Sequence, residues 1–181
     1  MNILKHLLLF TLCLIGTQTV AQEHEEHGSE DIPFHKVGVA LTHVNISSGV
    51  KDAGSKWITL PGFSLDYDYV FSKKWSVGLH TDIIIEKFAV KENLDSDEEI
   101  IERSYPIAPA VMLGRRLGHH TILLGAGAEF EKEETLFLNR FTYEYGIEIS
   151  EKWEVGLSFS YDLRWNAYDS YILGIVLCRK L

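Results

Sequence analysis

Apolar and polar residues alternate with a period of two along most of this chain, from residue 36 almost to its end. Successive side chains of a β-strand point to opposite faces, so the alternation predicts strands with one bulky apolar face and one small or polar face. Residues 153–166 show this clearly, because Trp153, Val155 and Leu157 alternate with Glu154 and Gly156. The pattern favours an all-β fold and leaves hardly any stretch with helical periodicity.

Eight segments carry this pattern or a weaker form of it. We expect strands at residues 36–47, 57–71, 75–88, 100–115, 120–131, 136–149, 153–166 and 171–180. Pro106 and Pro109 fall in the fourth, and a proline cannot donate to a strand ladder, so we expect a bulge there. A closed barrel has no edge to accommodate such residues, and the two prolines therefore argue against closure.

The connections between the strands differ in length. Residues 72–79 and 150–157 share Ser, Lys, Trp, Val, Gly and Leu at equal spacing, and both begin with a short turn; residues 115–120 contain a looser version. These turns occupy alternate connections and so belong to one end of a barrel, whereas the longest connections, 48–56 and 89–99, fall at the other end. This asymmetry is typical of outer-membrane barrels.

Side-chain size indicates which face points inward. The space enclosed by eight strands is only just filled by side chains, and five or six large apolar residues per strand would overfill it. The face of Gly, Ser and Ala with scattered charges is therefore expected inside, and the apolar face outside, in a closed eight-stranded antiparallel up-and-down transmembrane β-barrel. A soluble periplasmic β-domain that binds a ligand or a metal stays open as an alternative, because both kinds of protein alternate.

The ends of the chain and its charge narrow the class of protein. Residues 1–21 combine Lys5, a short apolar run and a small-residue motif, which predicts a cleaved signal peptide. The remaining chain carries sixteen Lys and Arg against twenty-six Asp and Glu, a net charge of −10, so nucleic acid is not expected as a partner. Only Cys178 would remain after cleavage, which excludes an intramolecular disulfide.

Two groups of side chains follow from the inward and outward assignment. Inward charges in a dry lumen must be paired, so we expect a polar network that plugs the barrel. Its predicted members are Asp66, Asp68, His80, Asp82, Arg140, Glu144, Glu148, Asp162 and Arg164. Aromatic residues near the strand ends predict two interfacial girdles. These are Trp57, Trp75, Trp153, Trp165, Tyr168 and Tyr171.

Residues 22–34 form a predicted flexible acidic segment that contains histidines and precedes the barrel domain at 35–181. His24 and His27, with His35 nearby, offer imidazole ligands among carboxylates, which a divalent metal could use. A solvated acidic tail is the simpler interpretation, since flexible ligands lose entropy on binding. No other cofactor is expected.

From residue 35 to 181 the chain resembles the small eight-stranded outer-membrane barrels of the OmpA/OmpX type, in strand count, turn and loop asymmetry, aromatic girdles and signal peptide. The resemblance implies a lipid bilayer and the barrel assembly machinery as partners. Those barrels usually finish on an aromatic residue, whereas this chain finishes on Cys178-Arg179-Lys180-Leu181.

We therefore expect a structural or surface-interaction protein of the bacterial outer membrane, with a plugged lumen and no catalytic activity. The alternative in the membrane is a hydrolase or acyltransferase, because His80 and Asp82 share a face and a His with a carboxylate can act as a general base. Such an enzyme would need Ser158 or Ser160 within reach.

Overall fold

The computed structural model describes residues 32–50, 55–91, 100–132, 134–165 and 167–181. The predicted signal peptide and nearly all of the acidic segment that follows it lie outside the described residues. Among the described residues, no helix is long and apolar enough to span a membrane.

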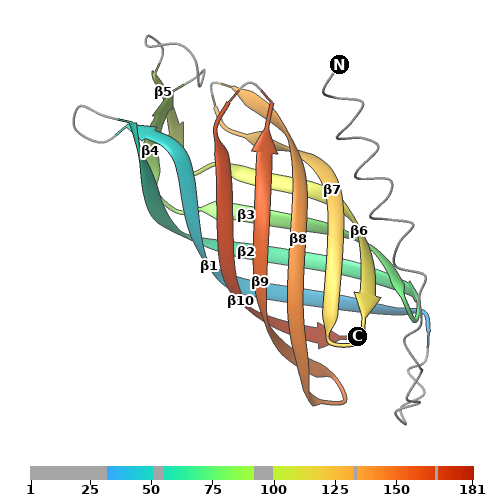
Figure 1. Ribbon diagram of the computed structural model, residues 1–181. Coiled ribbons are helices and arrows are strands. Elements are labelled where there is room, and N and C mark those ends of the chain that lie inside the picture. Colours follow the sequence, from blue (N-terminus) through green and yellow to red (C-terminus); the bar gives the residue numbers. More distant parts are fainter. Residues whose placement is uncertain (1–31, 51–54, 92–99, 133, 166) are drawn as a thin grey trace, which may run out of the picture. The chain divides into compact units, whose positions relative to one another are not determined.

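Ten strands account for most of the described chain (Figure 1). They are β1 (Phe34–Val50), β2 (Ser55–Ser72), β3 (Trp75–Ile84), β4 (Lys87–Lys91), β5 (Ile100–Ser104), β6 (Ile107–Leu117), β7 (His120–Phe130), β8 (Thr135–Ser150), β9 (Trp153–Arg164) and β10 (Asp169–Lys180). Eight of them, β1 to β3 and β6 to β10, pair in sequence order and antiparallel, and β10 pairs with β1. The predicted closed eight-stranded barrel is confirmed.

The prolines do not prevent closure. Pro109 pairs with Thr81, and the register between β3 and β6 runs from Trp75 to Ile83 without a shift, so the bulge expected there is absent. On the neighbouring strand β7, Gly127 allows β6 to approach closely beside Pro109, since a Cβ at Gly127 would lie 2.6 Å from the Cα of Ala110. Pro106 falls between β5 and β6, next to Tyr105 with a φ of 52°. The backbone irregularity is therefore confined to the residues before β6.

A small hairpin interrupts the predicted third and fourth strands. The segments expected at 75–88 and 100–115 break at residues 85–86 and 105–106. Their outer parts belong to β4 and β5, which pair with each other, and β4 extends to Lys91, into the connection expected at 89–99. Val90 of β4 also pairs with Gly49 at the end of β1. The hairpin thus extends from the barrel at the end that bears the long connections (Figure 1).

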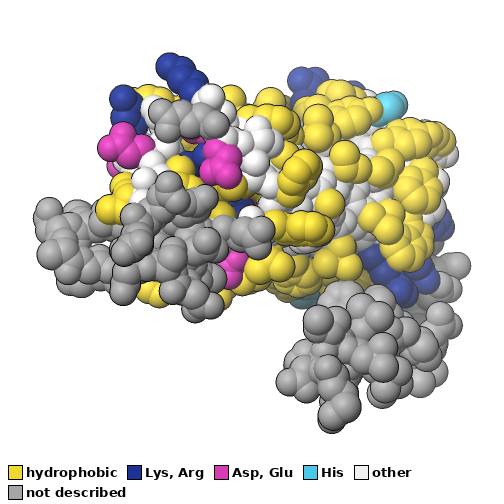
Figure 2. Space-filling model, turned by 90° about the horizontal axis from the view of Figure 1, so that it is seen from above, with side chains coloured by type: hydrophobic (Ala, Val, Ile, Leu, Met, Phe, Trp, Pro, Cys, Tyr) yellow, Lys and Arg dark blue, Asp and Glu magenta, His cyan; other side chains and the backbone are white. Residues whose placement is uncertain are grey.

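The two faces of the barrel have the polarity predicted from side-chain size. Leu65 and Leu157 are 60% and 61% exposed, while Asp66, the residue after Leu65, is buried. Apolar side chains gather over the outer surface of the strands in Figure 2. The short turns after β2, β6 and β8 lie at one end, as predicted, and Gly118 adopts a φ of 64° in the second of them.

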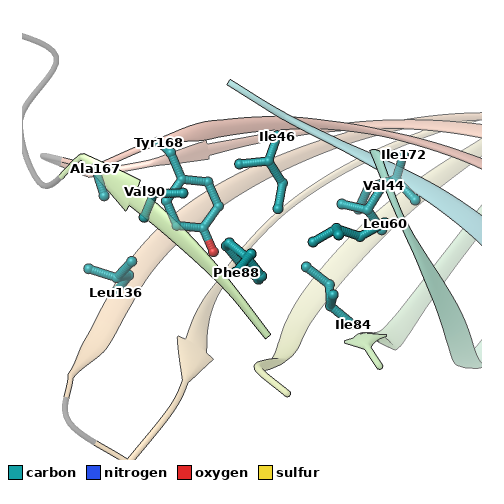
Figure 3. Packing of buried hydrophobic residues seen from close by; sticks show 10 residues of the cluster. All are labelled: Val44, Ile46, Leu60, Ile84, Phe88, Val90, Leu136, Ala167, Tyr168 and Ile172. Atoms are coloured by element: carbon teal, nitrogen blue, oxygen red, sulfur yellow. The ribbon is translucent and has the colours of Figure 1, made fainter. Parts of the chain in front are cut away.

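An apolar cluster fills the barrel at the end opposite the short turns. Phe88 and Val90 of the hairpin pack there with residues of the barrel strands (Figure 3). The barrel contributes Val44, Ile46, Leu60, Ile84, Leu136, Ala167, Tyr168 and Ile172. The Phe88 and Tyr168 rings meet edge to face, with centroids 5.7 Å apart. The hairpin therefore closes one mouth of the lumen with side chains excluded from water.

Candidate functional site

The lumen below the apolar cluster is lined by charged side chains. We call the part next to the cluster the arginine layer; it contains three arginines and three acids. They are Arg103, Arg140 and Arg164 with Asp82, Glu129 and Asp162, and each is at least nine-tenths buried. Equal numbers of opposite charges make this layer neutral, which a region out of contact with water requires.

Glu129 is the centre of the part of the arginine layer that lies next to the apolar cluster. Arg103 and Arg164 each approach one of its carboxylate oxygens to 2.7 Å, and the Tyr168 hydroxyl donates a hydrogen bond of 2.6 Å. The guanidinium carbon of Arg164 also lies 4.4 Å from the centre of the Tyr168 ring. The hairpin, which supplies Arg103, is in this way joined to β7 and β9 by charge as well as by apolar packing.

Arg140 is the centre of the part of the arginine layer that lies farther from the apolar cluster. It binds Asp82 at 2.7 Å on one side and Asp162 through two hydrogen bonds of 2.6 and 2.7 Å on the other. Bidentate pairs of this kind fix both the position and the plane of the guanidinium. Arg164 approaches Asp162 at 3.5 Å, so the six side chains form one connected network across the lumen.

A second group, the histidine cluster, lies nearer the short turns and consists of Asp66, Asp68, His80 and Glu144. The Nε2 of His80 lies 3.1 Å from Asp68 Oδ1 and its Nδ1 lies 3.6 Å from Asp66 Oδ1. Ser64 donates a hydrogen bond of 2.6 Å to Asp66. Glu144 is half-buried beside them, and its carboxylate comes within 4.8 Å of ligand atoms of His80 and Asp66.

The lumen ends in a ring of exposed or half-buried ion pairs at the short turns. Lys180 and Arg116 contact Glu148 at 2.7 and 3.3 Å, and Lys36 contacts Glu154 at 3.9 Å. Glu148 was expected inside the lumen, but its side chain is 46% exposed at this rim. The difference arises because β8 continues to Ser150 and its last residues lie where solvent reaches the inward face.

The predicted girdle residues fall at both ends of the apolar band, with one correction. Trp75 and Trp153 are exposed at the starts of β3 and β9, beside the short turns. At the other end Trp57 and Trp165 are exposed, and Tyr171 stacks on Trp57 with ring centroids 5.4 Å apart. Tyr168, by contrast, lies fully buried in the lumen, because its hydroxyl serves as a donor to Glu129.

Sequence reasoning missed two members of the arginine layer. Glu129 lies on the same face of β7 as Gly125 and Gly127, so extending the alternation by one step would have found it. Arg103 lies in β5, beyond the break at Tyr105 and Pro106, where the alternation of β6 no longer defines which face is inward. Nothing in the local pattern indicates that this arginine turns into the barrel.

The residues suggested for catalysis have other partners. His80 pairs with Asp68 and Asp66, while Asp82 pairs with Arg140. Ser158 and Ser160 line the same polar cavity as His80, and the Ser160 hydroxyl lies 2.8 Å from that of Thr142. The structure thus places these groups around one cavity, and within the described chain His80 and Asp82 pair with other residues and not with each other.

The histidines suggested as metal ligands are largely outside the described residues. His24 and His27 lie in the undescribed N-terminal part, so their role stays a prediction. His35 is exposed at the start of β1, and its Nδ1 lies 2.7 Å from the Tyr67 hydroxyl. The ring of His35 also stacks on that of Tyr67, on the outer surface near the short turns.

Comparison with known proteins finds similarity of fold. No family model and no curated protein matches the sequence. The structure is similar to Ail, the attachment invasion locus protein of Yersinia pestis, with a TM-score of 0.53, 12% identity and coverage of 82% of this chain and 99% of that one. The outer membrane protein AlkL, determined in lipid bilayers, has a TM-score of 0.57 and 9% identity, and the match covers 90% of this chain and 97% of that one. Neisserial surface protein A has a TM-score of 0.54 and 10% identity, and the match covers 81% of this chain and 97% of that one.

The comparison agrees with the fold described above. Eight antiparallel strands close on themselves, the outer face is apolar, the lumen is charged and filled, and short turns face long connections across the barrel. This chain has the fold of the small eight-stranded outer-membrane β-barrel proteins.

Proposed function

We propose that this protein spans the outer membrane of a Gram-negative bacterium as a plugged barrel and acts there in surface interaction or as a structural component. The observation that carries the proposal is the inverted polarity of the barrel. Large apolar side chains cover its outside, while arginines, carboxylates and a histidine fill its inside. Such an exterior is unfavourable in water and suits hydrocarbon.

The filled lumen supports an interaction role over transport. Eight strands leave no aqueous channel once side chains occupy the interior. Here the arginine layer crosses the lumen and the apolar cluster closes the mouth above it. Functional contacts would therefore be made by the outer surfaces and the exposed connections.

The end with the long connections offers the surface for such contacts. Outer-membrane barrels direct their longer loops away from the cell and their short turns toward the periplasm. In that orientation the β4–β5 hairpin, with exposed Lys87 and Glu102, would face the outside. Two of the similar structures have names that refer to attachment or to the cell surface, which supports a role of this kind.

Membrane fractionation combined with gel migration tests the proposal. The mature protein is expected in the outer-membrane fraction, and it should migrate differently on a denaturing gel before and after boiling, because a closed barrel resists detergent at room temperature. A protein recovered in the soluble periplasmic fraction, with one migration at both temperatures, would contradict the proposal and favour the soluble alternative.

A further inference from the structure

We propose that the histidine cluster binds one divalent transition-metal cation, of the Zn²⁺ class, through Asp66, His80 and Glu144. One ligand atom from each of these three side chains lies within 4.8 Å of the others. Two ligands about 2.1 Å from a tetrahedral ion are separated by about 3.4 Å. The distance of 3.6 Å between His80 Nδ1 and Asp66 Oδ1 is close to this value.

The second nitrogen of His80 has the partner that a metal ligand requires. Its Nε2 lies 3.1 Å from Asp68 Oδ1, while Nδ1 faces Asp66. In metal sites a carboxylate commonly holds the remote nitrogen of a ligating imidazole, which fixes the ring and its tautomer. Asp68 would serve as this positioning residue, so the cluster contains both direct ligands and the group that orients one of them.

Charge in this part of the lumen also favours a cation. The arginine layer is neutral by itself, but the described lumen side chains from the histidine cluster to the rim are not. The acids are Asp66, Asp68, Glu144, Glu148 and Glu154, and the bases are Lys36, Arg116 and Lys180. With His80 neutral, as a metal-bound imidazole must be, two negative charges remain. One divalent cation would balance them.

A buried polar atom whose hydrogen bond is not satisfied within the described residues lies in the same place. Thr42 is 4% exposed, and its hydroxyl has no hydrogen-bond partner among the residues that the structure describes. It lines the cavity that also contains Asp66, His80 and Glu144. Buried hydroxyls are normally paired, so an ion in this cavity, or one water bound there, would supply a partner for Thr42.

The ion has a path into the site. A neighbouring cavity begins among Lys36, Arg116 and Lys180 at the short turns and reaches Asp68 and Glu144. Glu144, a member of the histidine cluster, lines both cavities and so connects them. Entry would therefore occur from the short-turn end, since the arginine layer and the apolar cluster block the other.

The ligand types indicate which ions the site would prefer. Imidazole suits zinc, copper, iron and nickel, while an all-oxygen set suits magnesium and calcium. One histidine with two carboxylates, in a site too small for seven or eight oxygens, favours Zn²⁺. Mg²⁺ and Ca²⁺ should bind weakly in comparison.

Titration of the purified full mature chain with Zn²⁺ in detergent micelles tests the site. His24→Ala and His27→Ala are introduced first, so that the N-terminal histidines cannot contribute. This parent is expected to bind one Zn²⁺ per chain, and Co²⁺ in its place should give the visible absorption of a tetrahedral site. Glu144→Gln, which removes a ligand, should weaken binding at least 10-fold, and Asp68→Asn about 10- to 100-fold.

Glu102→Gln is the matched control, because Glu102 is exposed on the β4–β5 hairpin and does not belong to the lumen charges counted above. It should bind Zn²⁺ as the parent does, and heat-dependent gel migration verifies that each variant is folded. The proposal is overturned by a parent that binds no Zn²⁺, or by a folded Glu144→Gln variant that binds it as tightly as the parent. Failure here would leave the outer-membrane location untouched, since fractionation measures that separately.

Discussion

At the scale of single residues, the buried charges stabilise this barrel as a set. Taking an ion out of water costs several kcal/mol, and partners recover this cost only when every charge is matched. Arg140 illustrates the dependence, because it is the described cation that binds both Asp82 and Asp162. Removing one member therefore destabilises the barrel mainly because its partners are left with buried charge that is not balanced.

Arg140→Met should lower the free energy of unfolding by about 3–5 kcal/mol, since two carboxylates would be left buried with one of their cations missing. The measurement is a urea unfolding curve in lipid vesicles, followed by tryptophan fluorescence. Adding Asp82→Asn and Asp162→Asn to the same chain should restore part of the loss. A single variant as stable as the parent would show that water reaches this layer.

At the scale of elements, the β4–β5 hairpin is the part that departs from a simple barrel. Its strands are short, and a two-stranded hairpin alone is marginal in water. Here it is fixed by Phe88 and Val90 in the apolar cluster and by Arg103 on Glu129. These contacts turn an extension of two barrel strands into a cover over the lumen.

Phe88→Ala should destabilise the hairpin by about 3–5 kcal/mol, through the loss of apolar contacts and the cavity left behind. Hydrogen exchange of the backbone amides in residues 87–91 and 100–104 would report this as faster exchange than in the parent. Ile100→Ala is the control, because Ile100 is exposed on the same hairpin and its loss should change little. Equal exchange in all three proteins would mean that Phe88 does not hold the hairpin.

The sequence predicted the barrel strands because each alternates in the local chain, and it predicted which face is inward because an eight-stranded lumen is narrow. It did not predict the hairpin, since the local pattern near residues 85–86 and 105–106 does not show that β4 and β5 leave the barrel and pair with each other. Tyr168 was misplaced for a related reason. An aromatic residue near a strand end suits either face, and only the position of Glu129 decides that it turns inward.

At the scale of the whole molecule, the apolar outer surface of the barrel can be used to test whether lipid or water surrounds it. In water, an exposed leucine can be exchanged for a charge at little cost. In hydrocarbon the same exchange is expensive, and the cost depends on depth. The outer surface of the barrel can therefore be used to measure what surrounds it.

Leu65→Arg should reduce stability in lipid vesicles by about 2–4 kcal/mol, because Leu65 is 60% exposed near the middle of β2 and would lie close to the bilayer centre. The comparison is Lys73→Ala in the short turn after β2, which should change stability by less than about 0.5 kcal/mol. If Leu65→Arg unfolds at the same urea concentration as the parent, the apolar band does not face lipid.

The pairing of β1 with β10 has a consequence for how this protein comes to be assembled. Their ladder joins Lys36 to Lys180 and continues for eleven residue pairs to Ile46 and Ser170. These hydrogen bonds connect the first and the last barrel strand, so none of them can form until synthesis has passed the six barrel strands between them. Contacts so remote in sequence form slowly. Until β1 and β10 pair, both strands expose unpaired backbone groups that can pair with another chain. The unclosed barrel is therefore the form that must be protected from aggregation.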